Sequence, residues 1–543
     1  LYTNEIPYFT NTHIFKADPI VIEKLKEQNK LLRNDKLNHS YPHSWRSKAP
    51  LIYRATPQWF ISMQKNDLRI KAIKAINDTV FYPNKGKERL LSMVEGRPDW
   101  CVSRQRVWGV PLPIFINKKT KEPLRDKNVI DRIASIYEEQ GSDCWFTDNP
   151  KVFLGNEYDP NDYEKLNDIV EVWFDSGSTH SFVLEKRKDL KWPADMYLEG
   201  SDQHRGWFHS SLLESCGTRG KAPFKSILSH GFVVDGKGMK MSKSMGNVIS
   251  PEDILKNYGA DILRVWVASS DYAEDLRIDK SILTQHAESY RKIRNTFRFM
   301  LGNLKDKYEK QDFEKIDLKE LDELEQYILH KIYHISKSVE NNLNSYNFHK
   351  LYKELLNFCT LDLSSFYFDI RKDVLYCDSL SSKKRINCVK ILNIILESLL
   401  KWFAPILVFT TDEIYSLINK DEKNIHEHSF VNIPKKWENK KLSDKWDQLF
   451  KIKQEANIAI ETKRASKEIG SSLEAEVKLS VNKNKFELLQ NLDLAEYLIT
   501  SKAEKILSQD QEIKIEVNKA KGNKCPRCWK ILEKNCIRCS TLI

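Results

Sequence analysis

Glycines, lysines and hydroxyl side chains alternate in residues 230–247, whose sequence is HGFVVDGKGMKMSKSMGN. Glycine lets the backbone approach a ligand closely, and lysine ammonium groups oppose the charge of phosphate. A loop of this kind can close over a triphosphate, exclude water, and stabilise the charge that develops as pyrophosphate leaves. A solvated Gly/Lys turn is the alternative for this composition alone.

Four of the ten cysteines lie near the end of the chain, in the arrangement CPRCWKILEKNCIRC. Two Cys-x-x-Cys pairs can offer four thiolates tetrahedrally, which predicts one structural zinc ion. The predicted ligands are Cys525, Cys528, Cys536 and Cys539. Disulfides, another metal or a metal-free terminus are the alternatives, and the irregular scatter of the other cysteines favours a reducing compartment. The flanking basic residues are expected to favour thiolates and to contact nucleic-acid phosphate. They are Lys524, Arg527, Lys530 and Arg538.

Acidic, amide and aromatic side chains follow the apolar run MYL in residues 199–207, EGSDQHRGW. These polar groups are expected at the carboxyl end of a parallel strand, where ligands bind in open α/β sheets. If a helix begins near Gln203, Trp207 lies one helical turn beyond it.

Three regimes of apolar spacing predict the elements that position these groups. Residues 47–290 mix short apolar runs with polar helical stretches, which indicates α/β layering. Beyond residue 290, apolar residues at steps of three and four predict a helical bundle to about residue 440. The spaced residues are Leu321, Leu324, Ile328, Ile332, Ile335, Val339 and Leu343. Strict alternation in residues 473–481 and 513–517 predicts half-buried strands of a small terminal domain.

The length of 543 residues predicts several domains, and a net charge of +11 suits a polyanionic partner, although a generally Lys-rich composition would give the same charge. No apolar run is long enough for a membrane span, so a soluble, cytoplasmic protein is expected. The opening residues LYTNEIPYFT carry neither an initiator Met nor a signal arrangement, which suggests a cut sequence. Asp18 as N-cap and Pro19 as the first helical residue predict a helix over residues 19–33.

The string KMSKS resembles the second signature of class I aminoacyl-tRNA synthetases. Other segments resemble the isoleucyl members of that class in the family's order: residues 39–60, 99–115, 168–184, 195–213 and 399–415. The resemblance extends from the first residues to the last. A valyl or leucyl enzyme, which shares the architecture, is an alternative, and a non-catalytic RNA-binding remnant of a synthetase is another.

The resemblance implies ATP-dependent activation of L-isoleucine to isoleucyl-adenylate, with Mg²⁺ accompanying ATP, and transfer to tRNA(Ile). It makes Lys240 and Lys243 the catalytic candidates. The implied ATP-binding residues are His230, Gly231, Lys240, Met241, Ser242, Lys243 and Ser244. The implied aminoacyl-adenylate-binding residues are Trp173, Glu199, Gly200, Asp202, Gln203 and Trp207. By the same resemblance, the polar residues would accept hydrogen bonds from the ammonium group and the ribose hydroxyls, and Trp173 and Trp207 would wall the isoleucine side chain. Ordinary core packing is the alternative for each tryptophan.

The resemblance also implies a multidomain α/β plus all-α architecture in five parts. They are the tail of an inserted editing domain (1–44), the C-terminal part of a Rossmann-like catalytic domain (45–290), a helical anticodon-binding domain (291–440), a small α/β junction domain (441–520) and a zinc knuckle (521–543). The family's first signature, His-x-Gly-His, does not occur in the sequence, and the editing site would lie upstream. The isolated chain, a monomer by expectation, is therefore predicted to be inactive in adenylate formation.

Overall fold

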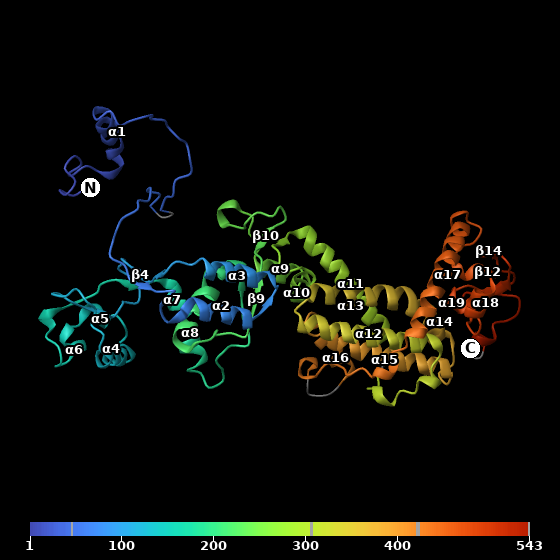
Figure 1. Ribbon diagram of the computed structural model, residues 1–543. Helices are drawn as coiled ribbons and strands as arrows, with labels where there is room; N and C mark the ends of the chain where they lie inside the picture. The colour runs from blue at the N-terminus through green and yellow to red at the C-terminus, as the bar shows by residue number, and fades with distance from the viewer. Residues whose placement is uncertain (45–46, 305–307, 420–423, 541–543) are drawn as a thin grey trace.

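The computed structural model describes residues 1–44, 47–304, 308–419 and 424–540. Figure 1 shows an extended arrangement in which a separate N-terminal segment is followed by a region of short strands and helices, then by long helices, and finally by a small terminal sheet. Among the described residues, no helix is both long and apolar enough to cross a membrane.

The N-terminal segment contains one α-helix, α1 (Ala17–Glu27), which stands apart from the remaining elements in Figure 1. The predicted helix over residues 19–33 was wrong at both ends. A 3-10 turn (Ile14–Lys16), capped by His13, runs directly into α1, so Pro19 lies inside the first turn instead of opening it. Among residues 1–44 only Ala17 is buried, so this segment has almost no core of its own.

A three-stranded parallel sheet forms the centre of the next region. Its order is β2 (Val80–Tyr82), β9 (Ser226–His230) and β8 (Tyr197–Gly200), with β9 in the middle. Parallel neighbours place their carboxyl ends at one edge, which is the edge where ligands bind in open α/β sheets. The predicted α/β layering is confirmed for this region.

Three helices surround this sheet: α2 (Leu68–Asp78), α3 (Lys85–Glu95) and α8 (Trp207–Arg219). Their apolar faces share one core cluster with the strands, in which Phe208 and Ile227 are fully buried. Apolar burial of this kind is the main force that holds such layers together.

A small module is inserted between α3 and β8, at the left end of Figure 1. Its elements are β4 (Ser103–Arg104), β5 (Phe115–Asn117), α4 (Lys127–Gln140), α5 (Cys144–Thr147), α6 (Pro150–Leu154), β6 (Tyr163–Lys165) and β7 (Ile169–Val170). It has a separate core centred on Trp145, whose ring lies against Phe115 and Phe153. The short helix α7 (Val172–Gly177) then returns the chain to α8.

The glycine- and lysine-rich segment follows β9. Strand β10 (Val233–Asp235) pairs in parallel with β11 (Leu276–Ile278), and the segment between them contains α9 (Pro251–Asn257) and α10 (Ala260–Ser269).

A helical bundle follows, and it begins at residue 280, ten residues before the predicted position. Its α-helices are α11 (Lys280–Leu304), α12 (Glu323–Asn344), α13 (Phe348–Asn357), α14 (Phe368–Cys377), α15 (Lys383–Phe403) and α16 (Val408–Ile418). The predicted apolar face is confirmed on α12, where Leu324, Ile328 and Ile332 are among the buried residues. Leu321 is buried just before the helix starts.

The terminal part packs against the bundle through the long helix α17 (Lys440–Ala465). Its sheet has β12 (Ala475–Val481) in the centre, parallel to β13 (Lys502–Leu507) and antiparallel to β14 (Lys514–Lys519). Every second residue of β12 is buried, as the alternation predicted. Because one hydrophobic cluster includes residues from both the bundle and β12, the two parts share a continuous core.

Candidate functional site

The carboxyl ends of β8 and β9 bring two predicted site segments together. Gly200 and His230 are register partners on these parallel strands. A Cβ added to Gly200 would lie 2.7 Å from Asp202 Oδ1 and 3.9 Å from the His230 ring. Glu199 and Asp202 are both exposed at this edge. The residues predicted to bind adenylate and those that begin the ATP segment therefore share one edge of the sheet.

Two tryptophans flank this edge. Gln203 Oε1 accepts a hydrogen bond of 2.9 Å from the Trp207 backbone N–H. The Trp207 ring stacks on Tyr197 with a centroid distance of 4.0 Å and an interplanar angle of 2°. Trp173 keeps 39% of its surface exposed, and its ring comes within 2.8 Å of where a Cβ of Gly206 would be. Gly206 thus permits the close approach of Trp173 to α8.

The helix expected near Gln203 begins instead at Trp207. Gln203 lies in a 3-10 turn (Ser201–His204), because the chain must bend sharply after the strand to reach the helix axis. Both contacts of Trp207 match core packing: its ring stacks on the buried Tyr197, and its indole Nε1 donates to Ser176 O at 3.0 Å. Its role as a wall of an apolar pocket stays a prediction.

The lysine-rich segment folds around two polar residues that sequence analysis did not single out. Asp235 Oδ1 accepts from the backbone N–H groups of Lys237 (3.0 Å) and Met239 (2.8 Å). Its other oxygen accepts from Asn247 Nδ2 at 2.9 Å, and Asn247 Oδ1 accepts from Ser242 N at 2.9 Å. The hydrogen bond from Asn247, followed by that from the Met239 N–H, lowers the pKa of Asp235 below its usual range. The Asp-Gly-Lys-Gly sequence carried a turn signal that could have identified Asp235.

The two predicted catalytic lysines are exposed on this scaffold. Within the described part of the chain, neither the Lys240 nor the Lys243 ammonium group makes an ion pair or hydrogen bond. Ser242 caps a 3-10 turn (Lys243–Met245) by accepting from Met245 N at 3.3 Å, and its hydroxyl lies 3.1 Å from that of Ser244. Two positive charges are therefore held in one structured segment without a counter-ion among the residues that the structure describes.

Gly231 lies where the backbone of β9 meets the segment before β11. Its N–H donates to Tyr272 O at 2.9 Å, and an added Cβ would come within 2.2 Å of Glu274 O. Only glycine fits this contact. The close approach gives Gly231 a structural role, while its predicted role in ATP binding stays a prediction.

Glu214, on α8, is a half-buried carboxyl that no motif or spacing marks in the sequence. Burial, together with the charges of Asp175 and Glu171, raises the pKa of Glu214 to about 9. A Cβ on Gly177 would lie 2.2 Å from Glu214 Oε1, so α7 and α8 meet at this point. Glu214 is accordingly protonated at neutral pH.

The four terminal cysteines come together as predicted. All four sulfur atoms lie within 4.8 Å of one another, and Cys528 Sγ and Cys536 Sγ are 3.8 Å apart. Tetrahedral zinc with Zn–S distances of about 2.3 Å requires sulfur atoms about 3.8 Å apart, so the arrangement fits this ion. All ten cysteines of the chain are free thiols in this structure. The cluster could hold a metal ion.

The local backbone favours a thiolate at the first of these cysteines. Burial acts to raise the pKa of Cys525, but hydrogen bonds to its sulfur from the N–H groups of Cys528 and Arg527 help to lower this pKa to about 7. The hairpin of β15 (Asn523–Lys524) and β16 (Ile531–Leu532) holds this turn in place.

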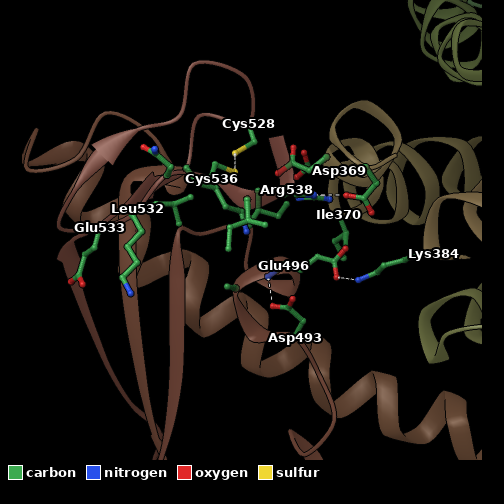
Figure 2. A pocket seen from close by; sticks show the side chains of 18 residues that line it. Asp369, Ile370, Lys384, Asp493, Glu496, Cys528, Leu532, Glu533, Cys536 and Arg538 are labelled. Carbon is green, nitrogen blue, oxygen red and sulfur yellow. Dashed lines mark hydrogen bonds and ion pairs between the residues drawn. The ribbon is translucent and has the colours of Figure 1, made fainter. Parts of the chain in front are cut away.

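The knuckle's basic residues mostly contact protein. Arg527 donates to Tyr376 O at 2.8 Å, and Arg538 pairs with Asp378, both at the end of α14. Figure 2 shows Arg538 among the residues that line a cavity of about 560 Å³, together with Asp369 and Ile370 of α14 and with Cys528 and Cys536. Beside it, Cys377 at the end of α14 packs against Cys525, Cys528 and Cys539. Lys524 lies 3.6 Å from Glu474. The expected phosphate contacts therefore compete with existing interactions, and for Lys530 they stay a prediction.

Two family models match the chain. The model described as tRNA synthetases class I (I, L, M and V) matches residues 9–279, and the anticodon-binding domain of tRNA ligase matches residues 325–479. The chain thus belongs to the class I tRNA synthetases of the isoleucine, leucine, methionine and valine group.

Within this family, the chain is similar to isoleucine–tRNA ligases. It is 67% identical to that of Pelagibacter ubique, over 99% of this chain and 59% of the relative, and 44% identical to that of Zymomonas mobilis, over 97% and 58%. The chain therefore spans about three-fifths of the length of these relatives. A methionyl-tRNA synthetase from Mycobacterium tuberculosis, solved with methionyl-adenylate, has a similar fold, with a TM-score of 0.51 and 16% identity over 71% of this chain and 68% of that one.

Proposed function

We propose that this chain takes part in isoleucine–tRNA ligation by contributing the phosphate-facing half of the activation site. The observation that carries the proposal is the register pairing of Gly200 with His230, which places the EGSDQ segment beside the first residue of the segment that leads to the lysine-rich turn. The similarity to isoleucine–tRNA ligases over nearly the whole chain supports isoleucine as the amino acid.

The proposed chemistry is attack of the isoleucine carboxylate on the α-phosphorus of ATP, with pyrophosphate as the leaving group. Lys240 and Lys243 stabilise the charge that spreads over the phosphate oxygens, and they are suited to this because no protein carboxylate neutralises them in the described structure. The remaining proposed ATP contacts come from His230, Gly231, Met241, Ser242 and Ser244. Mg²⁺ accompanies ATP, and the acyl group then passes to the terminal adenosine of tRNA(Ile).

The amino-acid side of the proposed site lies at the end of β8. Glu199, Asp202 and Gln203 supply acceptors for the ammonium group and the ribose hydroxyls, and Gly200 leaves room for the backbone to approach the adenylate. Trp173 and Trp207 line the pocket for the isoleucine side chain, because burial of apolar surface against a closely fitting aromatic ring is favourable.

The further parts of the proposal concern the other domains. Residues 1–44 form the tail of an editing domain, residues 291–440 bind the anticodon region of the tRNA, and residues 441–520 join them to the knuckle. Zn²⁺ is bound by Cys525, Cys528, Cys536 and Cys539, which favours folding of residues 521–543. The chain acts as a monomer in the cytoplasm.

The test is ATP–pyrophosphate exchange with isoleucine, valine or leucine, on the chain alone and on the chain mixed with the part of the Pelagibacter ubique relative that it does not cover. Exchange driven by isoleucine only in the mixed preparation supports the proposal, and exchange by the chain alone contradicts it, because half of an activation site should not form adenylate. Exchange driven by valine or leucine instead assigns a different amino acid, and tRNA binding without any exchange favours a non-catalytic RNA-binding protein.

A further inference from the structure

Helix α10 joins the lysine-rich turn to the helical bundle, and Figure 1 shows it where the sheet region meets the long helices. Trp266, on one side of α10, belongs to a buried cluster against which Met241 of the KMSKS string packs. Val265, the preceding residue, is fully buried in the core cluster of the bundle. The same helix is thus fixed to both parts of the molecule.

Helix α16 begins without a cap from its own chain segment. Its N-cap position is occupied by Leu407, which has no side-chain oxygen, and the first N–H groups of a helix lack intrahelical partners. The carboxylate of Asp261, on α10, accepts hydrogen bonds from Phe409 N (3.2 Å) and Thr410 N (2.8 Å). Asp261 therefore caps a helix that lies 149 residues further along the chain.

This capping contact is buried and extended by hydroxyl groups. Asp261 is only 8% exposed, and it also accepts from Thr410 Oγ1 at 2.6 Å. Tyr290, on α11, lies with its hydroxyl 2.8 Å from the same Thr410 Oγ1. A carboxylate at the amino end of a helix is further favoured by the helix dipole.

One turn later on α10, Arg264 contacts the same corner of the bundle. Its guanidinium donates to Pro405 O at 2.5 Å and to Ile406 O at 3.1 Å, which are carbonyls in the turn between α15 and α16. Asp261 thus accepts hydrogen bonds from backbone N–H groups at this corner of the bundle, and Arg264 donates to its backbone carbonyls. Residues three apart on a helix lie on one face, so both act as a single clamp.

We propose that Asp261 and Arg264 are positioning residues that fix the lysine-rich turn relative to the bundle, so that loss of the clamp loosens the turn. The meaning of this link for catalysis rests on the proposed function, in which the turn closes over ATP and the bundle binds tRNA. The physical link itself does not depend on that function.

Hydrogen–deuterium exchange of the full 543-residue chain, without nucleotide or tRNA, tests the clamp. Asp261→Asn replaces one of the two accepting oxygens with an NH₂ group and so removes one of the hydrogen bonds to the Phe409 and Thr410 amides, whose exchange should accelerate about fivefold, the factor for about 1 kcal/mol. It should also accelerate exchange of the amides in residues 238–246 at least about twofold, since coupled elements open together. Asp261→Glu keeps the carboxylate and should restore most of the protection in the turn.

The matched control is Asp126→Asn, which makes the same change at the N-cap of α4, where Asp126 accepts from Asn128 N at 2.8 Å. Any change in exchange should be confined to α4 and to the segment around Tyr158, which donates to the other oxygen of Asp126, and residues 238–246 should be unchanged. If Asp261→Asn affects the α16 amides but leaves residues 238–246 unchanged, Asp261 is a local cap and the proposal is overturned. If this variant does not fold, Arg264→Met replaces it, and unchanged exchange in residues 238–246 overturns the proposal in the same way. Because the measurement needs no catalysis, its failure is separate from failure of the proposed function.

Discussion

Asn247 donates a hydrogen bond of 2.9 Å to Asp235 and so closes the segment that contains Lys240 and Lys243. Asp235 and Asn247 also bind the backbone N–H groups of residues within the segment. The side chains of Asp235 and Asn247 thus set the shape of the turn, and the ammonium groups of Lys240 and Lys243 stay exposed. Such preorganisation is what electrostatic stabilisation of a developing charge requires.

Gly206→Ala should weaken isoleucine binding, because the added Cβ would come within 2.4 Å of Gln203 Oε1 and 2.8 Å of the Trp173 ring. Displacing these packed side chains costs about 1 to 3 kcal/mol, so the KM for isoleucine in pyrophosphate exchange, with the part of the relative that the chain does not cover supplied, should rise at least about fivefold. Gly217→Ala, in helix α8, is the control, since its Cβ would meet only Leu68 at 3.7 Å. An unchanged KM in Gly206→Ala would contradict the proposed place of Gln203 and Trp173 beside the isoleucine.

Glu214→Gln should change how stability depends on pH. Burial, then the charges of Asp175 and Glu171, raises the pKa of Glu214 from 4.5 to about 9, so the folded state holds a proton that the unfolded state releases. The free energy of unfolding therefore falls as pH rises between these values, by at most about 1.4 kcal/mol per pH unit from this group. Urea unfolding at pH 5 and pH 8 measures this change in the free energy of unfolding, which should be smaller for the Gln variant than for the parent. An equal change in both proteins would contradict the raised pKa of Glu214.

Arg371→Met should destabilise the bundle strongly. Arg371 and Glu325 have side chains that are 4% and 0% exposed and lie 2.6 Å apart, and Arg371 also pairs with Glu496 at 2.8 Å. Removing the cation leaves Glu325 buried without a counter-ion, which costs about 3 to 5 kcal/mol. Thermal or denaturant unfolding measures the loss. The double variant Arg371→Met/Glu325→Leu should recover part of it, and no recovery would mean that packing, not charge, was lost.

Removal of the metal should release the knuckle while leaving the bundle folded. Elemental analysis should find about one zinc per chain, and Cys528→Ser should reduce this content. Because Arg527 binds Tyr376 O and Arg538 pairs with Asp378, a strong chelator should accelerate hydrogen exchange near the end of α14. Exchange that stays slow there after zinc is lost would show that the knuckle docks without metal.

Elements with a strong local period were predictable, whereas contacts between distant segments were not. The alternation in β12 and the apolar face of α12 follow directly from which side chains must be buried. The cysteine cluster follows from its spacing. Helix starts were less predictable, because a preceding 3-10 turn shifted α1 away from the expected cap at Asp18.

The polar scaffold of the site was missed for a different reason. Asp235 and Asn247 act through hydrogen bonds within one loop, and only a turn signal pointed to the first of them. Glu214 and Asp261 acquire their roles from partners far away in the chain, as in the contact between Asp261 and Thr410. No periodicity or motif encodes such pairs, since they depend on how whole elements pack.

The most direct test of the proposed site compares three single lysine variants of the same turn in isoleucine-dependent ATP–pyrophosphate exchange, with the chain supplied with the part of the relative that it does not cover. Lys240→Ala and Lys243→Ala should each reduce the rate about 10² to 10³-fold, as expected for loss of one group that stabilises developing charge. Lys237→Ala removes an equal charge outside the KMSKS string and should reduce it less than about tenfold. Equal effects of all three substitutions, or full activity without Lys240 and Lys243, would contradict the assignment of the turn to ATP.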